Sequence, residues 1–253
     1  MAENNFSLQK TLTMLLDEKK YHSLRDILST MNPADIAAIF DDLDQACLPL
    51  LFRLLPKELA AETFVEMEPE AQELLIRGFS DSELKEVIDE LYVDDAVDIV
   101  EEMPANVVQR ILSQAEPDMR KQINEILRYP EDSAGSIMTT EYVSLRPNMT
   151  VEEAILRIRR TGIDKETIYT CYVTRGHKLI GLTSVKDLLL CEDDDATIES
   201  IMQEHVITVS TLDDKEQVAQ MFSKYNFLAL PVVDTENRLV GIVTFDDAMD
   251  VME

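Results

Sequence analysis

Leu179-Ile-Gly-Leu-Thr-Ser-Val-Lys-Asp187 returns 60 residues later in the chain as Leu239-Val-Gly-Ile-Val-Thr-Phe-Asp-Asp247. A shorter pair precedes it, since Ser136-Ile-Met138 returns after 64 residues as Ser200-Ile-Met202. In each copy, β-branched runs alternate with helical stretches, which predicts the order strand, helix, strand, strand, helix. Because the two offsets differ by four residues, we expect an insertion in the first copy near residues 161–166.

The repeated turn, Gly-x-x-Ser/Thr-x-x-Asp, lies between the last strand and the last helix of each copy. We expect Thr244 to cap the helix that begins at Phe245, because its hydroxyl can accept a hydrogen bond from an exposed helix amide. Asp247, one turn into that helix, favours the positive helix start and can accept hydrogen bonds from a ribose diol. Ser184 and Asp187 take the same places in the first copy.

The whole repeat is similar to tandem CBS domains, which we predict at residues 136–197 and 198–253. The resemblance implies a pseudo-twofold pair of CBS domains, a homodimer formed through such pairs, and adenine nucleotides such as ATP bound at the turns. An aromatic side chain would stack on the base, and a lysine would contact the phosphates. The resemblance thus implies these nucleotide-binding residues: Tyr169, Ser184, Lys186, Asp187, Phe227 and Thr244. The alternative is that both turns are capped helices that bind no ligand.

Residues 1–130 read as short helices throughout. Their starts are marked by Asn32-Pro33, Leu55-Pro56, Ser80-Asp81 and Met103-Pro104. A degenerate repeat of an acid, an apolar stripe and a later Leu or Met recurs at residues 35–43, 83–91 and 95–103. Since helices this short need neighbours to be stable, we predict an all-α superhelical repeat domain. Residues 131–135 are expected to link it to the βαββα pair, which makes the fold class multi-domain α plus α/β.

The composition excludes several classes of function. The chain has 23 basic and 50 acidic residues, a net charge of −27, which repels nucleic acid and anionic membrane. Its three cysteines are scattered, which favours a reducing compartment, and no run approaches the ~20 apolar residues of a membrane helix. We find no set of catalytic residues or cofactor loop, so we predict a soluble cytosolic protein that is not an enzyme.

The sequence of the helical half narrows the choice of protein family. Leu54-Leu-Pro-Lys-Glu-Leu-Ala-Ala-Glu62, Val93-Asp-Asp-Ala-Val-Asp98 and the junction Tyr129-Pro-Glu-Asp-Ser-Ala-Gly-Ser-Ile-Met-Thr139 resemble the N domain of MgtE-type magnesium transporters or channels. With the CBS pair, the resemblance spans almost the entire chain. It implies the cytosolic regulatory region of a membrane protein, at the cytoplasmic face of the cell membrane. We therefore expect a fragment that would continue into a connecting helix and a membrane pore domain.

Acid clusters occur in both halves. Residues 80–103 hold ten acids against the single base Lys85, and Asp94 and Asp98 share a helical face because they are four residues apart. Mg²⁺ prefers oxygen ligands and keeps most of its water, so loosely clustered carboxylates suit it. The family resemblance implies these metal ligands: Glu62, Asp94, Asp95, Asp98, Glu216, Asp247 and Asp250. Asn226 departs from the pattern, because we expect a carboxylate there in some relatives.

Our hypothesis is that several weakly bound Mg²⁺ ions hold the acidic helical domain against the CBS pair, in a compact state that would close the pore. One alternative is an adenine-nucleotide-sensing CBS protein that controls a partner. Another is a helical-repeat adaptor whose acidic surface docks a basic partner. The sequence does not distinguish Mg²⁺ from Mn²⁺ or Ca²⁺, because surface carboxylates discriminate poorly among hard cations.

Overall fold

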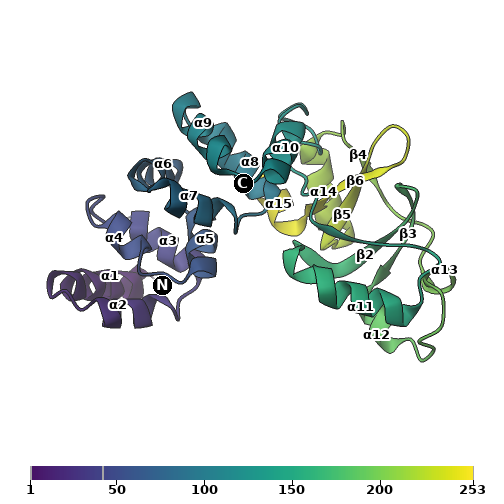
Figure 1. Cartoon of the computed structure of the whole chain (residues 1–253), viewed down its shortest axis with the longest axis horizontal. Helices are drawn as coiled ribbons and strands as arrows, with labels where there is room; N and C mark the ends of the chain where they lie inside the picture. Colours follow the sequence, from purple (N-terminus) through teal and green to yellow (C-terminus); the bar gives the residue numbers. More distant parts are fainter. Residues whose placement is uncertain (1, 42, 253) are drawn as a thin grey trace. The chain divides into compact units, whose positions relative to one another are not determined.

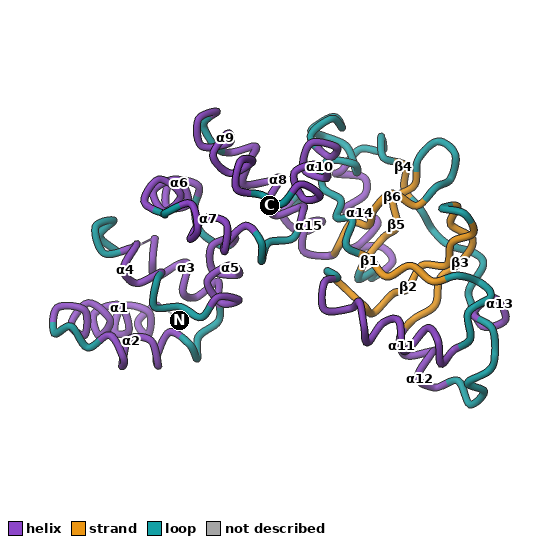
Figure 2. Tube along the Cα trace, viewed as in Figure 1, coloured by secondary structure: helices purple, strands orange, loops and turns teal. Residues whose placement is uncertain are grey.

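The computed structural model describes the backbone of residues 2–41 and 43–252, and side chains from residue 10 onward within those ranges. The chain forms two compact units (Figures 1 and 2). The first contains the residues up to Leu91 and Asp95–Arg120, and the second contains Tyr92–Asp94 and the residues from Lys121 onward. The first unit is helical, whereas all the strands labelled in Figure 1 belong to the second.

The helices of the first half follow the predicted start signals. Their bounds are α1 Ala2–Asp17, α2 Tyr21–Leu28, α3 Pro33–Asp41, α4 Leu48–Phe52, α5 Lys57–Val65, α6 Pro69–Gly78, α7 Asp81–Ile88, α8 Val93–Glu102, α9 Ala105–Gln114 and α10 Pro117–Ile126. Ser80 caps α7 in a reciprocal capping box with Glu83, and Pro33 begins α3. Helix α3 packs on α5, α5 on α7, and α7 on α9. This succession is the stacking that the degenerate repeat predicts.

Each CBS copy has the predicted order of elements. The first contains β1 Tyr142–Leu145, α11 Val151–Thr161, β2 Thr167–Arg175, β3 Lys178–Ser184 and α12 Val185–Leu190. After the short helix α13 Ile198–Ile201, the second contains β4 Val209–Ser210, α14 Lys215–Tyr225, β5 Ala229–Val233, β6 Leu239–Thr244 and α15 Phe245–Asp250. In both sheets the first two strands are parallel and the last two are antiparallel. The predicted insertion is a 3-10 turn, η1 Gly162–Asp164.

The two copies exchange the segments that carry the Ser-Ile-Met repeat. Thr139, from the start of the first copy, bridges to Ile242 in the second with N–O distances of 2.8 and 2.9 Å. Gln203, from the start of the second copy, bridges in the same way to Leu182 in the first. A Cβ on Gly241 would lie 2.7 Å from the Met138 sulfur, which shows how closely the exchanged segment crosses the strand. The repeated motif therefore joins the copies.

The apolar core between the two copies follows from this exchange. Tyr172 of β2 is fully buried among Leu179, Ala229, Leu239 and Ile242, which come from both copies. Tyr142 packs edge-to-face on Tyr172, with ring centroids 6.0 Å apart. Each copy alone would expose its own side of this core to water, so we expect the two copies to fold together.

The predicted linker is packed against the second CBS copy. Ala134 N donates to Asp213 O at 2.7 Å, and Gly135 N donates to Thr211 O at 3.0 Å. Lys215 N in turn donates to Asp132 O at 3.0 Å. These bonds give the backbone groups of the segment partners, and they fix it to the loop between β4 and α14.

Candidate cation and nucleotide sites

The turn that ends the second CBS copy contains a half-buried carboxylate. Thr244 is 5% exposed, and its backbone N donates to Asp247 Oδ2 at 3.1 Å. The Thr244 hydroxyl donates to the same oxygen. The capping box, in which the Thr244 side chain accepts from the backbone of Asp247, confirms the predicted cap. Burial raises the pKa of Asp247 to about 6, hydrogen bonds from Thr244 partly oppose the rise, and Asp246 and Asp250 add to it. The ionised carboxylate is therefore costly here, and a bound cation would lower that cost.

The matching turn in the first copy has the same kind of cap, but the residue before its aspartate carries the opposite charge. Ser184 Oγ donates to Asp187 Oδ2 at 2.7 Å, and Asp187 N donates to Ser184 Oγ at 3.0 Å. Both Asp187 and the neighbouring Lys186 are exposed. Lys186 takes the place that Asp246 has in the second copy, so only the first turn offers a side-chain cation to a phosphate.

The aromatic residues near the two turns are not equivalent. Thr170 pairs with Ser184 in the first sheet, and Ala229 pairs with Thr244 in the second. The register therefore makes Leu228 the counterpart of Tyr169, and these side chains are 61% and 67% exposed. Tyr169 has the exposed ring face that base stacking requires.

Phe227 lies one position before that register point and belongs to an aromatic cluster. Its ring lies edge-to-face against Phe222, with centroids 6.3 Å apart, and 5.4 Å from the ring of Tyr225. Phe245, which directly follows Thr244, lies 6.5 Å from Phe222 and is 46% exposed. Sequence reasoning overlooked Tyr225 and Phe245, although an aromatic residue beside a capping threonine was a usable signal. The role of Phe227 in nucleotide binding stays a prediction.

The predicted metal ligands of the helical half differ in their surroundings. Glu62 on α5 and Asp98 on α8 are exposed, and Asp95 is half-buried. Asp94 is only 5% exposed, although it lies on the same helical face as Asp98 by spacing. Asp94 is therefore not the solvated surface acid that charge patterning alone would suggest.

Sequence reasoning overlooked Glu141, which lies at the start of α8. Its Oε2 accepts hydrogen bonds from Val93 N at 3.2 Å and from Thr139 Oγ1 at 2.7 Å. A carboxylate at this place satisfies an amide of the first helical turn and favours the positive helix end. Glu141 thus adds one acid beside Val93, the residue that precedes Asp94. This proximity is visible only in the tertiary structure.

The predicted ligands of the CBS half lie on two neighbouring helices. Glu216 is exposed in the first turn of α14, and α14 packs against α15, which carries Asp247 and the exposed Asp250. Asn226 ends α14 in the left-handed conformation, with φ 54°, and its N donates to Phe222 O at 2.8 Å. Asparagine adopts this conformation readily, so the C-cap gives Asn226 a structural role.

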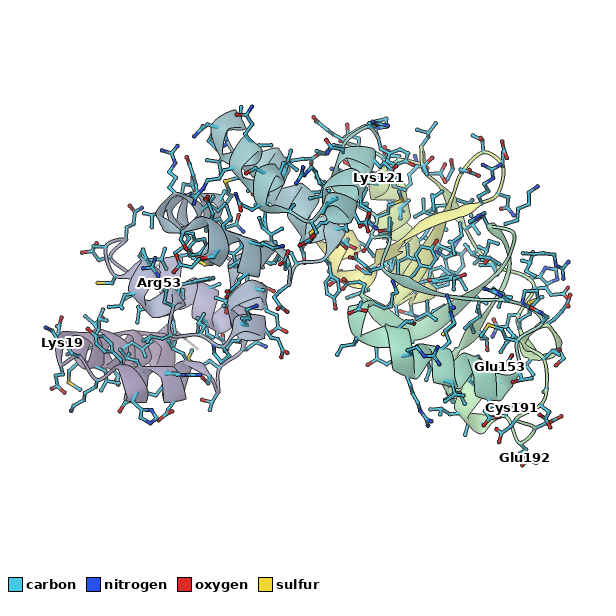
Figure 3. The ribbon with its side chains drawn as sticks, viewed as in Figure 1. Lys19, Arg53, Lys121, Glu153, Cys191 and Glu192 are labelled. Atoms are coloured by element: carbon cyan, nitrogen blue, oxygen red, sulfur yellow. The ribbon has the colours of Figure 1, made fainter. Side chains whose placement is uncertain are left out.

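The acidic loop after α12 has a local structure of its own. Asp195 N donates to Asp193 Oδ1 at 3.1 Å, which closes an Asx turn beside Cys191 and Glu192 (Figure 3). Within residues 2–41 and 43–252, no group of three or more His, Cys, Asp or Glu is arranged to hold a metal ion. Glu62, Asp95 and Asp98 belong to the first unit, whereas Asp94, Glu216, Asp247 and Asp250 belong to the second. Their assignment as metal ligands stays a prediction.

Comparison with known protein families divides the chain in two. The family described as MgtE intracellular N domain matches residues 31–132. The family described as CBS domain matches residues 134–192 and 198–253. Over the part of the chain that the structure describes, no helix has both the length and the apolar character needed to cross a bilayer.

Two similar curated proteins are named magnesium transporter MgtE. The protein from Thermus thermophilus is 39% identical over 251 residues, which are 97% of this chain and 55% of that protein. The protein from Bacillus subtilis is 31% identical over 242 residues, 95% of this chain and 53% of that protein. The chain thus spans about half the length of these curated relatives.

Two solved structures match nearly the whole chain. The cytosolic domain of the Mg²⁺ channel MgtE in complex with ATP has a TM-score of 0.90 and 38% identity, covering 96% of this chain and 99% of that chain. The soluble part of a magnesium transporter has a TM-score of 0.87 and 32% identity, covering 100% of this chain and 98% of that chain. These similarities confirm the predicted fold class.

Proposed function

This chain belongs to the MgtE family, and from that membership we propose that it is the cytosolic magnesium-sensing region of a magnesium transporter or channel. In this proposal it is a regulatory, non-enzymatic region at the cytoplasmic face of the cell membrane, and it acts on a membrane pore domain. The names of the two similar curated proteins support transport of magnesium. The acidic composition supports a role in binding cations, since the net charge is −27.

The observation that carries the sensing role is the carboxylate group on α15. Asp247 is half-buried and has a raised pKa, and Asp246 and Asp250 raise it further. Mg²⁺ bound to these oxygens would turn mutual repulsion into attraction, and it tolerates a loose arrangement because it keeps several of its waters. The remaining proposed ligands are Glu62, Asp94, Asp95, Asp98 and Glu216.

The switch that we propose depends on a difference in Mg²⁺ affinity between two states. Ions that contact acids of both units would favour a compact state, in which the pore domain is closed. Moving such an equilibrium from mostly open to mostly compact requires about 5 kcal/mol of differential binding, which several weak ions can supply together. Loss of the ions at low magnesium would then release the two units.

A second ligand has its own support. We propose that ATP or another adenine nucleotide binds at the first-copy turn, where Lys186 and the exposed Tyr169 lie near the Ser184 cap. The similar structure solved with ATP supports this choice of ligand. Asp187 would accept hydrogen bonds from the ribose, whereas Phe227 and Thr244 would contribute to a second, weaker site.

The CBS helices also expose large apolar side chains, which supports the proposed homodimer. Leu189 and Leu190 at the end of α12 are 62% and 69% exposed, and Phe245 and Met249 on α15 are 46% and 38% exposed. Neighbouring exposed apolar side chains, such as Leu189 and Leu190, are typical of protein interfaces. We expect sedimentation equilibrium to show a dimer that Leu190→Glu weakens.

Small-angle scattering tests the magnesium switch directly. We expect a smaller radius of gyration in ~10 mM MgCl₂ than in NaCl of equal ionic strength, because only the dication can bridge carboxylates. Substitution of Asp94, Asp98, Asp247 and Asp250 by Asn should abolish that difference. A radius that responds to magnesium equally well in this variant would contradict the proposal. Calorimetry showing ATP binding in EDTA, with no response of the shape to magnesium, would favour a nucleotide sensor instead.

A further inference from the structure

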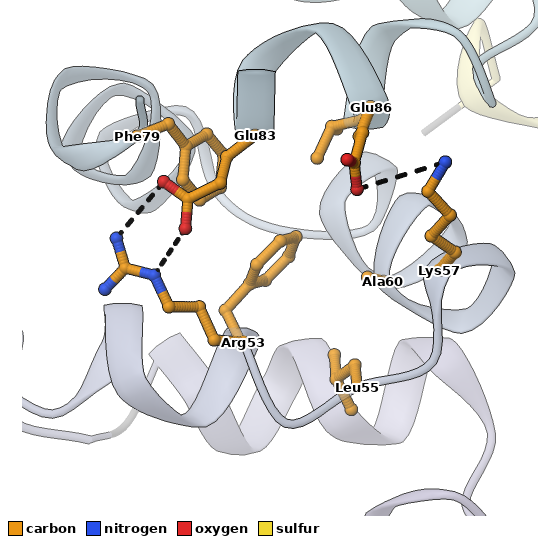
Figure 4. A pocket seen from close by; sticks show the side chains of 9 residues that line it. Arg53, Leu55, Lys57, Ala60, Phe79, Glu83 and Glu86 are labelled. Atoms are coloured by element: carbon orange, nitrogen blue, oxygen red, sulfur yellow. Dashed lines mark hydrogen bonds and ion pairs between the residues drawn. The ribbon is translucent and has the colours of Figure 1, made fainter. Parts of the chain in front are cut away.

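The helical unit contains a small cavity that the proposed magnesium and nucleotide sites do not use. It has a volume of about 210 Å³ and lies between α4, α5 and α7 (Figure 4). Five apolar side chains line it: Phe52, Leu55, Ala60, Phe79 and Val87. A cavity of roughly 150 Å³ holds a benzene molecule, and ligand pockets usually exceed roughly 300 Å³. This cavity therefore fits one large apolar side chain better than a nucleotide.

The walls of the cavity are firmly packed. Phe52 and Phe79 are 4% and 5% exposed, and their ring centroids lie 5.4 Å apart. Phe64 packs behind both, at 6.1 and 6.5 Å. Since these rings hold one another in place, the cavity is preformed, and a group that enters it loses little free energy to rearrangement of the walls.

One side of the rim is an ion pair whose acid accepts further hydrogen bonds from Ser80. Arg53 Nε donates to Glu83 Oε1 at 2.7 Å, and Ser80 N and Oγ donate to Glu83 Oε2 at 2.8 and 2.9 Å. The Arg53 guanidinium holds the pKa of Glu83 down to about 2, with the Ser80 hydrogen bonds acting in the same direction. The Glu83 carboxylate is thus already bonded within the protein, and it fixes the shape of the rim (Figure 4).

On the other side of the cavity, Glu86 lines the rim and Glu90 lies beside the lining, and both carboxylates share Lys57. Lys57 Nζ lies 3.9 Å from Glu86 Oε2 and 3.7 Å from Glu90 Oε1, both beyond hydrogen-bonding distance. The Glu86 side chain is 59% exposed. The lining itself balances two acids, Glu83 and Glu86, against two bases, Arg53 and Lys57. The excess negative charge comes from Glu90 beside the lining and from a chain whose net charge is −27. The surroundings of the cavity therefore attract a cation of a partner and repel an acidic one.

We propose that this cavity docks a basic, amphipathic peptide segment of a partner protein. One Phe- or Leu-sized side chain would insert between Phe52, Phe79 and Val87, and a neighbouring Lys or Arg would pair with Glu86 and Glu90. An apolar anchor in a desolvated pocket supplies affinity, and the charged rim supplies orientation and selectivity. This site is independent of magnesium sensing, since none of its residues belongs to the proposed metal ligands.

The test uses the whole 253-residue chain and short amidated peptides. The probe has one Phe among alternating Lys and Ala residues; one control peptide has Ala in place of Phe, and another has Glu in place of every Lys. Measured by fluorescence anisotropy at near-physiological salt, the probe should bind at least about tenfold more tightly than either control. Equal binding of the probe and the Phe-to-Ala peptide would overturn the proposal, because it would show attraction by charge alone. Equal binding of the Glu peptide would overturn the proposed basic partner.

Protein variants locate the site. Ala60→Leu fills the cavity and should weaken binding of the probe peptide about tenfold. Glu86→Gln should weaken that binding about threefold. Glu70→Gln is the matched control, because Glu70 is an exposed acid on α6 that does not line the cavity. Should Ala60→Leu fail to fold, chemical-shift mapping of the unaltered chain replaces it. Shifts centred on Phe52, Phe79 and Val87 would support the proposal, and shifts confined to other helices or self-association through this face would overturn it.

Discussion

In the first CBS copy the capping Ser184 is followed by Val185, Lys186 and Asp187, whereas in the second copy Thr244 is followed by Phe245, Asp246 and Asp247. The backbone is the same in both turns, since each cap bonds reciprocally to the aspartate three residues later. The chemistry differs, because one turn pairs a lysine with an exposed carboxylate and the other places three aspartates on one short helix.

This difference shows how a duplicated fold can separate two tasks. The cap is part of the fold and must recur, because the helix start needs its amides satisfied. The residue directly before the aspartate, Lys186 or Asp246, is exposed in both copies, so its charge is free to vary without cost to the fold. We interpret the first turn as the one suited to a phosphate and the second as the one suited to a cation.

The largest effect on stability is expected at Gly181 and Gly241, matching positions at which the two copies are most alike. A Cβ at Gly181 or Gly241 would lie 2.9 or 2.8 Å from a backbone carbonyl oxygen of the exchanged segment. Ala at either position should lower the free energy of unfolding by about 3 kcal/mol in urea denaturation, because that backbone must move. Gly78→Ala is the control, since nothing lies within 4 Å of the added carbon. Equal stability of all three variants would disprove the exchange.

The second expected effect is a difference between Asp247 and Asp187 in how their contribution to stability depends on pH. The pKa of Asp247 in the folded state is about 6, above its ordinary value of 3.8, so the fold binds the proton more tightly than the unfolded chain does. The contribution of Asp247 to stability should therefore be greatest below pH ~4 and should fall by up to about 3 kcal/mol as the pH rises through 6.

Asp247→Asn should remove this loss while keeping an acceptor for Thr244. Denaturation in EDTA from pH 4 to 7 measures it, with Asp187→Asn as the control because the exposed Asp187 makes the same capping contacts. If Asp247→Asn and the unaltered chain show the same pH profile, burial does not raise the pKa of this carboxyl.

A third effect concerns nucleotide affinity. Lys186→Ala should weaken ATP binding about tenfold in calorimetry, because the first turn would lose its side-chain cation. Lys178→Ala is the matched control, since Lys178 is also exposed but lies at the opposite end of β3. An unchanged affinity for ATP in Lys186→Ala would show that the phosphates do not bind at this turn.

The smallest effect is expected from substitutions that make the second turn resemble the first. Leu228→Tyr supplies the exposed aromatic ring that Tyr169 provides in the first copy, and Asp246→Lys supplies the cation. Added to Asp246→Lys, the tyrosine should improve ATP binding at the second turn about threefold, because base stacking is a modest contribution. The comparison with Asp246→Lys alone isolates the ring, and no gain would exclude stacking at this register position.

Local features of the sequence predicted much of the fold. The repeat of the Gly-x-x-Ser/Thr-x-x-Asp turn predicted both caps, and the prolines near residues 33, 56 and 104 predicted helix starts. Non-local features were not accessible in this way. The proposed stacking residue Phe227 was chosen by its place in the chain, whereas strand register makes Leu228 the counterpart of Tyr169. The burial of Asp94 likewise depends on what surrounds α8.

By itself, the sequence determined the repeat, the order of the elements and the capping chemistry, because each depends on residues a few positions apart whose backbone preferences are local. The tertiary structure alone decided that the Ser-Ile-Met segments cross between copies and that the predicted linker is bonded to the second copy. It also decided that α4, α5 and α7 enclose a cavity. These features join residues far apart in the chain, and they follow from packing of apolar surface and pairing of backbone groups, which no local pattern encodes.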